Sequence, residues 1–343
     1  MRAVVIHAPK DLRIDTVPET ALAANEVRVR IGAGGICGSD LHYYHHGGFG
    51  TVRVKEPMTL GHEISGTLAA VGSDVEHLRI GQRVAVNPSR ACGRCAYCHA
   101  GVHNQCLDMR FMGSAMRFPH MQGGFAESLT IDQRQAVPIP DDLSLAEAAM
   151  AEPLAVSLHA ARQAGSLFGK RVLITGCGPI GALAVLVAKN AGAAELVVTD
   201  IATQPLEMAK RLGATLVVNA AKEPEALKPY AADKGQFDVL IEATGNETAI
   251  RSALELVRPG GTVVQLGLGG DVTLPMNLIV AKELTLKGTF RFDAEFELAV
   301  QLMARKIIDV RPVISAQIPF TEAVSAFELA TDRNRAMKVQ LVF

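Results

Sequence analysis

The pattern of apolar and polar positions divides the chain into two parts. Before about residue 150, short valine-containing runs are broken by glycine, as in segments 3–8, 26–32, 66–72 and 82–88. Runs of this length between turn residues are typical of β-strands. The first part is therefore predicted to be a compact, β-rich domain.

From residue 154 onward, apolar runs of strand length alternate with segments of helical periodicity. The predicted strands are 171–176, 195–200, 215–219, 237–245, 261–267 and 284–290. The predicted helices are 179–193, 204–214 and 248–260, and the last fifty or so residues add a helix at 294–306 and short strands that end in 337–343. Alternation of this kind predicts an α/β domain with a doubly wound parallel sheet, covered by helices on both faces.

Composition narrows the function without defining it. The chain has 343 residues, 49% of them hydrophobic, and 34 Lys and Arg against 35 Asp and Glu give a net charge of −1. This length fits about two domains. The balanced charge gives no reason to expect nucleic acid or an anionic membrane as partner. The N-terminus lacks a secretory apolar region and no apolar run could span a bilayer, so we expect a cytoplasmic enzyme with a small-molecule substrate.

Four of the six cysteines are clustered in segment 88–106. They are Cys92, Cys95, Cys98 and Cys106, with the spacing C-x2-C-x2-C-x7-C. Four thiolates this close together are typical of a tetrahedral zinc site, whereas disulfides between such near neighbours would close strained loops. Because the protein fills all four positions, the zinc is predicted to be structural and to organise a lobe at about residues 88–110. A zinc ribbon on a nucleic-acid-binding protein is the alternative from another class, and the neutral charge argues against it.

A glycine-rich motif follows the predicted strand 171–176 and opens the next helix. It reads Gly176, Cys177, Gly178, Pro179, Ile180 and Gly181, which is G-x-G-x-x-G. The first glycine allows a tight turn, the second lets a pyrophosphate approach the backbone, and the third lets helix and strand pack closely. The free amides of the helix N-terminus then bind the phosphates, and proline suits the first turn. The motif predicts a dinucleotide-binding (Rossmann) domain.

Asp200 ends the next predicted strand, 19 residues after Gly181, where a carboxylate binds the ribose hydroxyls. A carboxylate there repels an extra phosphate, and segment 201–205 offers no arginine to receive one, since Lys210 and Arg211 lie a full helix away. The sequence therefore predicts NAD, with NADP left open. Thr244, Gly267 and Arg291 are further residues expected at the cofactor, although the run 267–270 lacks a following helix and by itself indicates a loop beside the sheet.

The stretch 61–75 carries the pattern G-H-E-x2-G-x5-G-x2-V, formed by Gly61, His62, Glu63, Gly66, Gly72 and Val75. With the two motifs above, it resembles the zinc-dependent medium-chain dehydrogenases, and the resemblance extends over essentially the whole chain. Glu152 stands where alcohol dehydrogenases of this family have a cysteine, which resembles the polyol dehydrogenase branch. The resemblance implies a GroES-like catalytic domain formed by residues 1–153 and 290–343 around a Rossmann domain at 154–289.

The resemblance also implies a second, catalytic zinc with an open position. Cys37 and His62 match two of its ligands, and either Glu63 or Glu152 supplies a carboxylate; the sequence does not choose between them. Ser39 and His42 match the proton-relay positions of the family. Since segment 39–44 also has the character of a helix start, Ser39 could equally be a helix cap. The implied reaction is the zinc-assisted oxidation of an alcohol by NAD.

The substrate implied by the resemblance is a sugar acid or polyol, oxidised at C5 in the sugar-acid case. A carboxylate on the substrate favours a bidentate arginine. Arg291 matches the substrate-contacting arginine of the branch, Tyr43 matches its tyrosine, and Arg110 and Arg117 lie on the distinctive loop 109–120. Neutral polyols and threonine, the substrate of a related dehydrogenase group, remain rival substrates. Relatives in the branch are commonly tetramers or dimers, so we expect a homotetramer.

Overall fold

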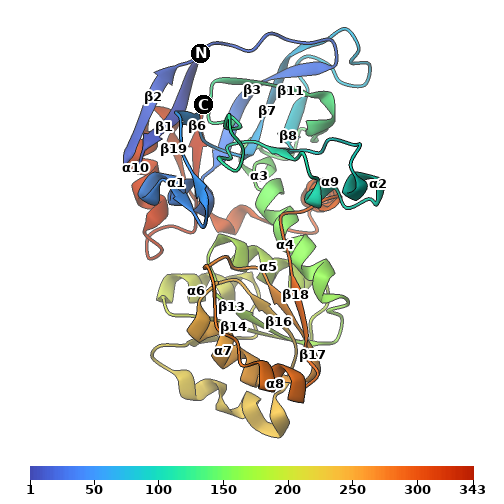
Figure 1. Ribbon diagram of the computed structural model, residues 1–343, viewed down its shortest axis with the longest axis vertical. Helices are drawn as coiled ribbons and strands as arrows, with labels where there is room; N and C mark the ends of the chain where they lie inside the picture. The colour runs from blue at the N-terminus through green and yellow to red at the C-terminus, as the bar shows by residue number, and fades with distance from the viewer.

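Two bodies of sheet and helix, joined by a narrower waist, make up the computed structural model, which describes residues 1–343 (Figure 1). Both chain termini lie in the upper body of Figure 1, which contains the N-terminal half of the chain and its last segment. The lower body contains the middle of the chain, from α5 to β18. None of the helices has the length and apolar character needed to cross a bilayer.

The upper body is built from β-strands. Its main sheet has the order β12 (Ala136–Pro138), β8 (Arg83–Val86), β7 (Glu63–Val71), β3 (Glu26–Gly35), β20 (Lys338–Val342) and β19 (Ile314–Pro319), with β11 (Ser128–Asp132) also paired to β3. A smaller sheet has the order β2 (Asp11–Thr16), β1 (Arg2–Ala8), β6 (Met58–Thr59), and two short pairs join β4 (Gly48–Phe49) to β5 (Val52–Arg53) and β9 (Ser89–Arg90) to β10 (Arg110–Phe111). The last strand of the chain, β20, thus lies beside β3.

Short helices close the upper body and a longer one forms the waist. The short helices are α1 (Gly38–His46), α2 (Ala96–His99), α3 (Leu145–Ala148) and α10 (Ala323–Thr331), with 3-10 turns at His103–Gln105, Gln133–Gln135, Arg311–Val313 and Phe320–Glu322. At the waist lies α4 (Ala151–Ala164), and α9 (Glu295–Ala304), at the lower part of the upper body, packs against it (Figure 1). The largest apolar core, 38 buried residues, includes side chains from both of these helices and from the lower sheet, so the two bodies share one continuous core.

The lower body is a six-stranded sheet in which every neighbouring pair is parallel. Its order is β15 (Leu216–Asn219), β14 (Glu195–Asp200), β13 (Arg171–Thr175), β16 (Phe237–Glu242), β17 (Val257–Gln265) and β18 (Thr285–Gly288). Its helices are α5 (Pro179–Asn190), α6 (Thr203–Leu212), α7 (Glu247–Leu256), α8 (Met276–Ala281) and a kinked 3-10 segment at Pro224–Lys234. In chain order the strands run 3-2-1-4-5-6, the arrangement of a dinucleotide-binding sheet. The predicted fold class is confirmed.

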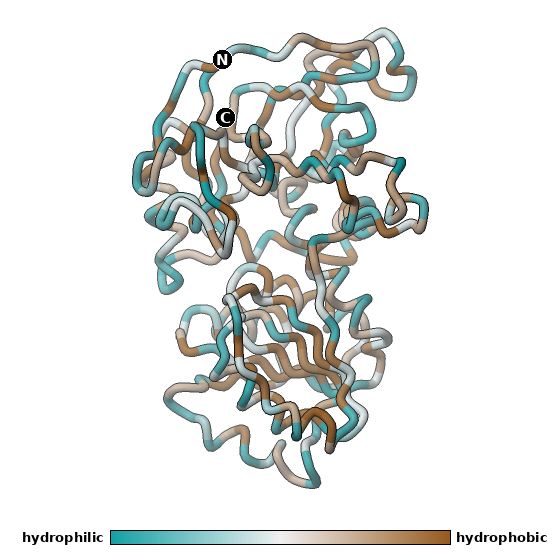
Figure 2. The backbone as a smooth tube through the Cα atoms, in the orientation of Figure 1, coloured by the Kyte–Doolittle hydropathy of each residue, from teal (hydrophilic) through white to brown (hydrophobic).

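Both faces of the central strands of this sheet are buried, as expected for a parallel sheet. Along β13, Val172 and Ile174 belong to the core under α4 and α5, whereas Leu173 belongs to the core under α7. Figure 2 shows the strands as a brown, apolar layer inside the lower body. The predicted helix at 248–260 was too long, since α7 ends at Leu256 and β17 begins at Val257. Pro259 explains the difference, because proline disfavours the helical conformation of the residue before it.

Candidate active site and cofactor site

The four clustered cysteines of segment 88–106 converge in the lobe formed by β9, α2 and the turn at His103–Gln105. Their sulfur atoms, those of Cys92, Cys95, Cys98 and Cys106, all lie within 4.8 Å of one another. All four are free thiols, and Cys95 Sγ lies 3.5 Å from Cys98 Sγ, well beyond a disulfide bond. Backbone N–H groups of Cys98 and Leu107 lower the pKa of Cys95 to about 6. This geometry fits a closed tetrahedral zinc site.

A second group of metal-ligating side chains lies where α1 and β7 begin. Cys37 immediately precedes α1, Glu63 is the first residue of β7, and His62 lies just before it. Their ligand atoms lie within 4.8 Å of one another, and His62 and Glu63 are buried. Burial, and then the charge of Glu63, raise the pKa of the Cys37 thiol to about 12. A thiolate at this position therefore requires a cation close by.

The imidazole of His62 lies between the metal-ligating cluster and the buried carboxylate of Asp40. Its Nδ1 is buried, has no hydrogen-bond partner, and lies 3.8 Å from Oδ1 of Asp40. Asp40 is itself fully buried, and it accepts hydrogen bonds from the backbone N–H of Cys37 at 3.0 Å and of Gly61 at 3.3 Å. A ring nitrogen of His62, the thiol of Cys37 and the carboxylate of Glu63 together fit a zinc ion with three protein ligands and an open position.

Lys338, which the sequence did not single out, pairs with this group. Its Nζ donates to both carboxylate oxygens of Glu63 at 2.7 Å and to the carbonyl of Ile36 at 3.1 Å. The lysine side chain is 2% exposed and that of Glu63 is 0% exposed. Burial lowers the pKa of Lys338, but the charges of Glu63, Cys37 and Glu152 and the hydrogen bond to Glu63 together outweigh it, and the net shift of the pKa is upward. The ammonium therefore balances the Glu63 carboxylate.

Glu152, the other candidate ligand, lies in the first turn of α4 and is 5% exposed. It is not among the side chains whose ligand atoms converge with those of Cys37 and His62. It is still a close electrostatic neighbour, since burial, and then the charges of Glu63 and Cys37, raise its pKa to about 8 against the opposing effect of His62. The geometry thus favours Glu63 as direct ligand and places Glu152 at the edge of the cluster.

Ser39 and His42 lie on α1, three residues apart and therefore on one face of the helix. The alternative that Ser39 caps this helix is wrong, because the cap is Cys37, whose N–H is bound by Asp40. Burial, and then the charge of His46, lower the pKa of His42. Tyr43 is 1% exposed, and its hydroxyl accepts a hydrogen bond from the N–H of Ala115 at 3.0 Å. Tyr43 thus holds the loop 109–120 through this hydrogen bond.

Arg291 approaches the metal-ligating cluster through a single aromatic ring. Its guanidinium carbon lies 4.0 Å from the ring centroid of Phe111, and the centroids of Phe111 and His62 are 5.4 Å apart. Burial lowers the pKa of Arg291 to about 10, while the charge of Glu152 opposes that shift. Arg291 and Arg117 line the same cavity of about 260 Å³.

The other two arginines proposed for the substrate differ from Arg291. Arg117 also pairs with Asp108 and donates to the carbonyl of Met109 at 2.7 Å, so part of its guanidinium is already engaged. Arg110 is exposed on β10 and is not among the residues that line the cavity. Of the three arginines predicted at the substrate, Arg291 is therefore the one that is linked to the cluster through the ring of Phe111.

Residues of the zinc lobe form hydrogen bonds with the segment that carries Arg291. Asn104 donates from Nδ2 to the carbonyl of Phe290 at 3.0 Å, and the backbone N–H of His103 donates to Asp293 at 3.0 Å. His103 Nδ1 lies 3.1 Å from the same carboxylate. Arg291 itself has φ +55°, a left-handed conformation that is uncommon for any residue other than glycine. Neighbours on both sides of it are thus held by the loop between the third and fourth cysteine.

The glycine-rich motif has the geometry of a nucleotide-binding turn. Gly176 has φ +83°, and α5 begins at Pro179 with Gly178 as its N-cap. A Cβ at Gly181 would overlap the carbonyl oxygen of Gly176, whereas a Cβ at Gly178 would meet nothing within 4 Å. The third glycine is thus needed for packing, and the second faces open space where a pyrophosphate can approach. Ile180, the remaining motif residue, is half-buried.

The ends of β16 and β17 lie beside the glycine-rich turn, since a Cβ at Gly176 would meet the side chain of Thr244. The buried carboxylate of Glu242 accepts hydrogen bonds from the N–H of Thr244 at 2.8 Å and of Gly245 at 2.9 Å. Gly267 packs directly against Gly245, since a Cβ there would overlap the N–H of Gly245. The structure therefore brings Thr244 and Gly267 together at the carboxyl edge of the sheet, where nucleotides bind in such folds.

Asp200, at the end of β14, has a partner that the sequence did not suggest. Its carboxylate accepts hydrogen bonds from the N–H groups of Cys177, Ile201 and Ala202 at 2.8, 2.8 and 3.0 Å. Arg333 Nη2, from the segment between α10 and β20, donates to both oxygens at 2.9 and 3.1 Å. Segment 201–205 contains no arginine, as the sequence indicates, but an arginine from a distant segment does reach this carboxylate.

A dinucleotide-binding sheet, a closed four-cysteine site and an open Cys–His–Glu cluster define the class of zinc-dependent, NAD(P)-linked dehydrogenases. Comparison with known families agrees with this class. Residues 23–141 match the alcohol dehydrogenase GroES-like domain, and residues 179–305 match the zinc-binding dehydrogenase domain. The zinc-ribbon alternative is excluded.

Individual relatives define the family more closely. The chain is 46% identical over 320 residues to L-idonate 5-dehydrogenase (NAD(P)(+)) of Escherichia coli, which covers 93% of this chain and 92% of that relative. It is 37% identical to the sorbitol dehydrogenase of Bacillus subtilis, over 99% of this chain and 97% of the relative. The crystal structure of the Escherichia coli L-idonate 5-dehydrogenase superposes with a TM-score of 0.95 at 43% identity, covering 100% of this chain and 98% of that one. The chain belongs to the zinc-dependent medium-chain dehydrogenases, in their polyol dehydrogenase branch.

Proposed function

We propose that this enzyme oxidises the C5 hydroxyl of L-idonate, or of a closely related sugar acid, to the ketone 5-keto-D-gluconate, with NAD as the hydride acceptor. The C–H hydrogen leaves as hydride and the hydroxyl hydrogen leaves as a proton, so that one NADH and one proton form for each alcohol oxidised. The relative that is 46% identical carries the name of this activity.

One observation in the site carries the proposal. Arg291 stacks on Phe111, whose ring neighbours His62, so a guanidinium lies one aromatic ring away from the metal-ligating cluster. A guanidinium binds a carboxylate through two parallel hydrogen bonds. A sugar acid has a carboxylate at one end and a hydroxyl several carbons away, and the two could occupy the arginine and the cluster together.

The chain's own residues would orient the substrate and carry its proton. Bound to Cys37, His62 and Glu63, zinc supplies the Lewis acid that lowers the pKa of the substrate hydroxyl, as NAD supplies the hydride acceptor. We assign Ser39 as the first proton acceptor and His42, on the same helix face and exposed, as the group that passes the proton to solvent.

Other residues hold this arrangement in place. Glu152, at the edge of the cluster, is assigned to a water-mediated or exchanging contact, and Tyr43 to support of the substrate loop. The glycine motif and Asp200 would hold the pyrophosphate and ribose, beside the wall formed by Thr244 and Gly267.

Initial rates of NADH formation test the proposal. Zinc-replete enzyme is assayed with L-idonate, gluconate, sorbitol, xylitol and L-threonine, each with NAD and with NADP. We expect L-idonate to have the highest kcat/KM, and Arg291→Ala to raise KM for L-idonate more than for sorbitol. Arg110→Ala is the matched control, because Arg110 is an exposed arginine outside the cavity. Equal loss on both substrates would contradict a carboxylate contact at Arg291.

A neutral polyol is the second candidate substrate, because the chain is 37% identical to a sorbitol dehydrogenase. Preference for sorbitol or xylitol in the same assay would keep the zinc reaction and discard the anion site. Preference for L-threonine would move the enzyme to the threonine dehydrogenase group. Absence of activity on every substrate, in a preparation that contains zinc, would contradict the catalytic role of Cys37 and His62.

We further propose the domain division 1–153 with 290–343, and 154–289, and a homotetramer. The exposed edge strand β18 supports assembly, since all four of its residues are exposed and an unpaired strand can pair with a second copy. A cytoplasmic location is proposed because four free thiols at metal spacing fit a reducing compartment. Light scattering of the zinc-replete enzyme measures the assembly directly.

A further inference from the structure

The carboxylate of Asp200 is saturated with hydrogen-bond donors. An ionised carboxylate offers about four acceptor sites. Three are taken by the N–H groups of Cys177, Ile201 and Ala202, and Arg333 Nη2 donates to both oxygens from the outer side. A ribose hydroxyl can therefore donate to Asp200 only if the guanidinium of Arg333 moves away.

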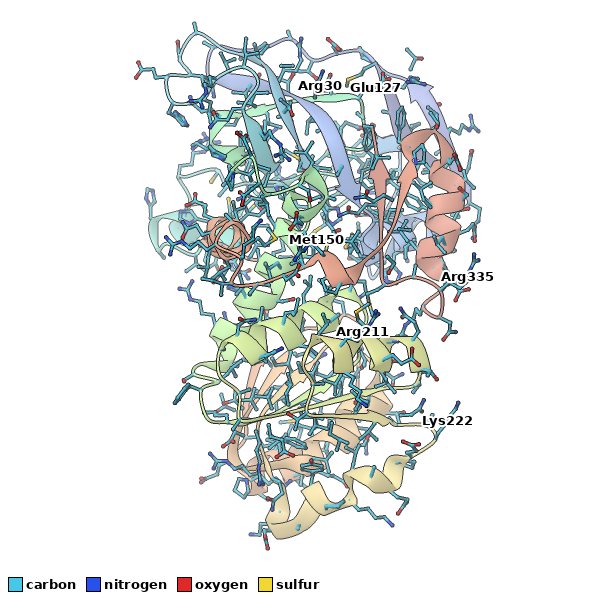
Figure 3. All side chains as sticks on the ribbon, turned by 180° about the vertical axis from the view of Figure 1, so that it is seen from behind. Arg30, Glu127, Met150, Arg211, Lys222 and Arg335 are labelled. Carbon is cyan, nitrogen blue, oxygen red and sulfur yellow. The ribbon has the colours of Figure 1, made fainter.

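Arg333 reaches this carboxylate from a distant part of the chain. It lies between α10 and β20, on the segment of the upper body that descends toward α6 of the lower body (Figure 1). Figure 3 shows Arg335 on this same segment, above the part of the lower body that carries Arg211. The Arg333 side chain is 53% exposed, whereas that of Asp200 is 2% exposed. The guanidinium thus lies on the solvent side of the buried carboxylate and can turn toward solvent.

The other cations near β14 do not pair with Asp200. Arg211 lies in the last turn of α6, and its guanidinium contacts Met208 Sδ at 3.7 Å. Lys210, also in that turn, is exposed and makes no ion pair. Arg333 is thus the cation that is paired with the carboxylate at which the ribose is expected to bind.

We propose that Arg333 is a specificity-determining residue of the cofactor site and admits nucleotides with a 2′-phosphate, which Asp200 alone would repel. The inference rests on the proposed binding of the ribose at Asp200. A 2′-phosphate has no hydrogen-bond donor to offer Asp200, so the guanidinium of Arg333 stays paired with that carboxylate. Because only Nη2 is used on Asp200, the Nη1 and Nε donors remain free for the phosphate. With NAD, the ribose hydroxyls replace the guanidinium, which turns to solvent.

We expect Arg333→Ala to change the affinities for the two classes of nucleotide in opposite directions. Nucleotides with a 2′-phosphate lose charge-assisted hydrogen bonds, and we expect their affinity to fall about ten- to a hundredfold. Nucleotides without that phosphate lose a competitor for Asp200, and we expect their affinity to rise a few-fold. Arg333→Lys retains the charge without the planar donor arrangement, and its affinity for the 2′-phosphate should lie between those of wild type and Arg333→Ala.

Calorimetric titration of the full-length, zinc-replete enzyme with 2′,5′-ADP and with 5′-AMP measures both effects without any turnover. The matched control is Arg335→Ala, since Arg335 lies on the same exposed segment and its side chain makes no ion pair. We expect Arg335→Ala to leave the ratio of the two affinities as in wild type, and Arg333→Ala to shift it toward 5′-AMP.

Three results would overturn the proposal while leaving the cofactor site intact. They are an unchanged affinity ratio in Arg333→Ala, an equal weakening of both nucleotides, and a wild type that binds 5′-AMP but not 2′,5′-ADP. An equal weakening would mean that Arg333 only supports the shape of the site. Binding of neither nucleotide to wild type would instead contradict the proposed site at Asp200, and with it the proposed function.

Discussion

Replacing Lys338 with methionine should destabilise the zinc-free protein far more than the zinc-loaded protein. The ion pair of Lys338 with Glu63 is almost fully buried, with exposed fractions of 2% and 0%, and both carboxylate oxygens accept from Nζ at 2.7 Å. Removing one partner of a buried pair leaves the other charge without compensation, which typically costs about 3–5 kcal/mol. Two hydrogen bonds to a charged group, at about 1.5–3 kcal/mol each, give a similar range.

Zinc changes this expectation because a bound cation beside Glu63 replaces the missing ammonium. The assay compares thermal unfolding midpoints of wild type and Lys338→Met, each with zinc and after chelation. Lys282→Met is the matched control, since Lys282 is also buried but donates to the carbonyls of Leu254, Glu255 and Val257 and to no carboxylate. We expect its loss of stability to be the same with and without zinc. An equal loss for Lys338→Met in both states would refute the placement of zinc beside Glu63.

Three further outcomes are expected. Cys98→Ala should lower the bound zinc, measured by elemental analysis, from two ions per chain to one, and should lower the thermal midpoint because a closed site has lost a ligand. Asn104→Asp removes the Nδ2 donor that holds the segment of Arg291, so KM for L-idonate should rise about tenfold with a smaller change in kcat, while His99→Ala in the same lobe should change neither. Burial of Glu295 opposes its charged form, yet contacts with His159 and Arg162 and backbone N–H groups lower its pKa to about 2. The stability that this carboxylate contributes is thus complete above its ordinary pKa near 4.5 and is lost as pH falls toward 2. The free energy of unfolding, measured as a function of pH, should show this loss in the wild type and should not show it in Glu295→Gln.

What the sequence predicted well depends on residues that are close together along the chain. The glycine motif, its strand and helix, and Asp200 lie within 30 residues, and their spacing alone identifies a dinucleotide-binding unit. The four cysteines span only 15 residues, and their convergence follows from ligand spacing. Short-range patterns therefore predicted the dinucleotide-binding unit and the four-cysteine cluster, whereas the residues of the Cys37 cluster came from the family resemblance.

The sequence analysis missed two ion pairs between residues that are far apart along the chain. Arg333 lies 133 positions from Asp200, and Lys338 lies 275 positions from Glu63. No local pattern encodes the position of β20 beside β3, because strand pairing depends on the whole fold. One signal was available, since Lys338 has the one charged side chain in the final segment 337–343, and a lysine is rarely fully buried unless it is paired.

The two missed cations lie on the same segment of the chain, and this explains why each is paired with a carboxylate at a proposed binding site. Arg333 and Lys338 lie five positions apart on the segment that leads into β20. One is paired with Asp200 at the proposed ribose site, and the other with Glu63 at the proposed zinc site. A buried carboxylate that is reserved for a ligand needs a counter-charge while the ligand is absent. Because β20 pairs with β3 only a few residues before Cys37, the same strand supplies that counter-charge to the metal site, while the segment before it supplies the counter-charge to the nucleotide site.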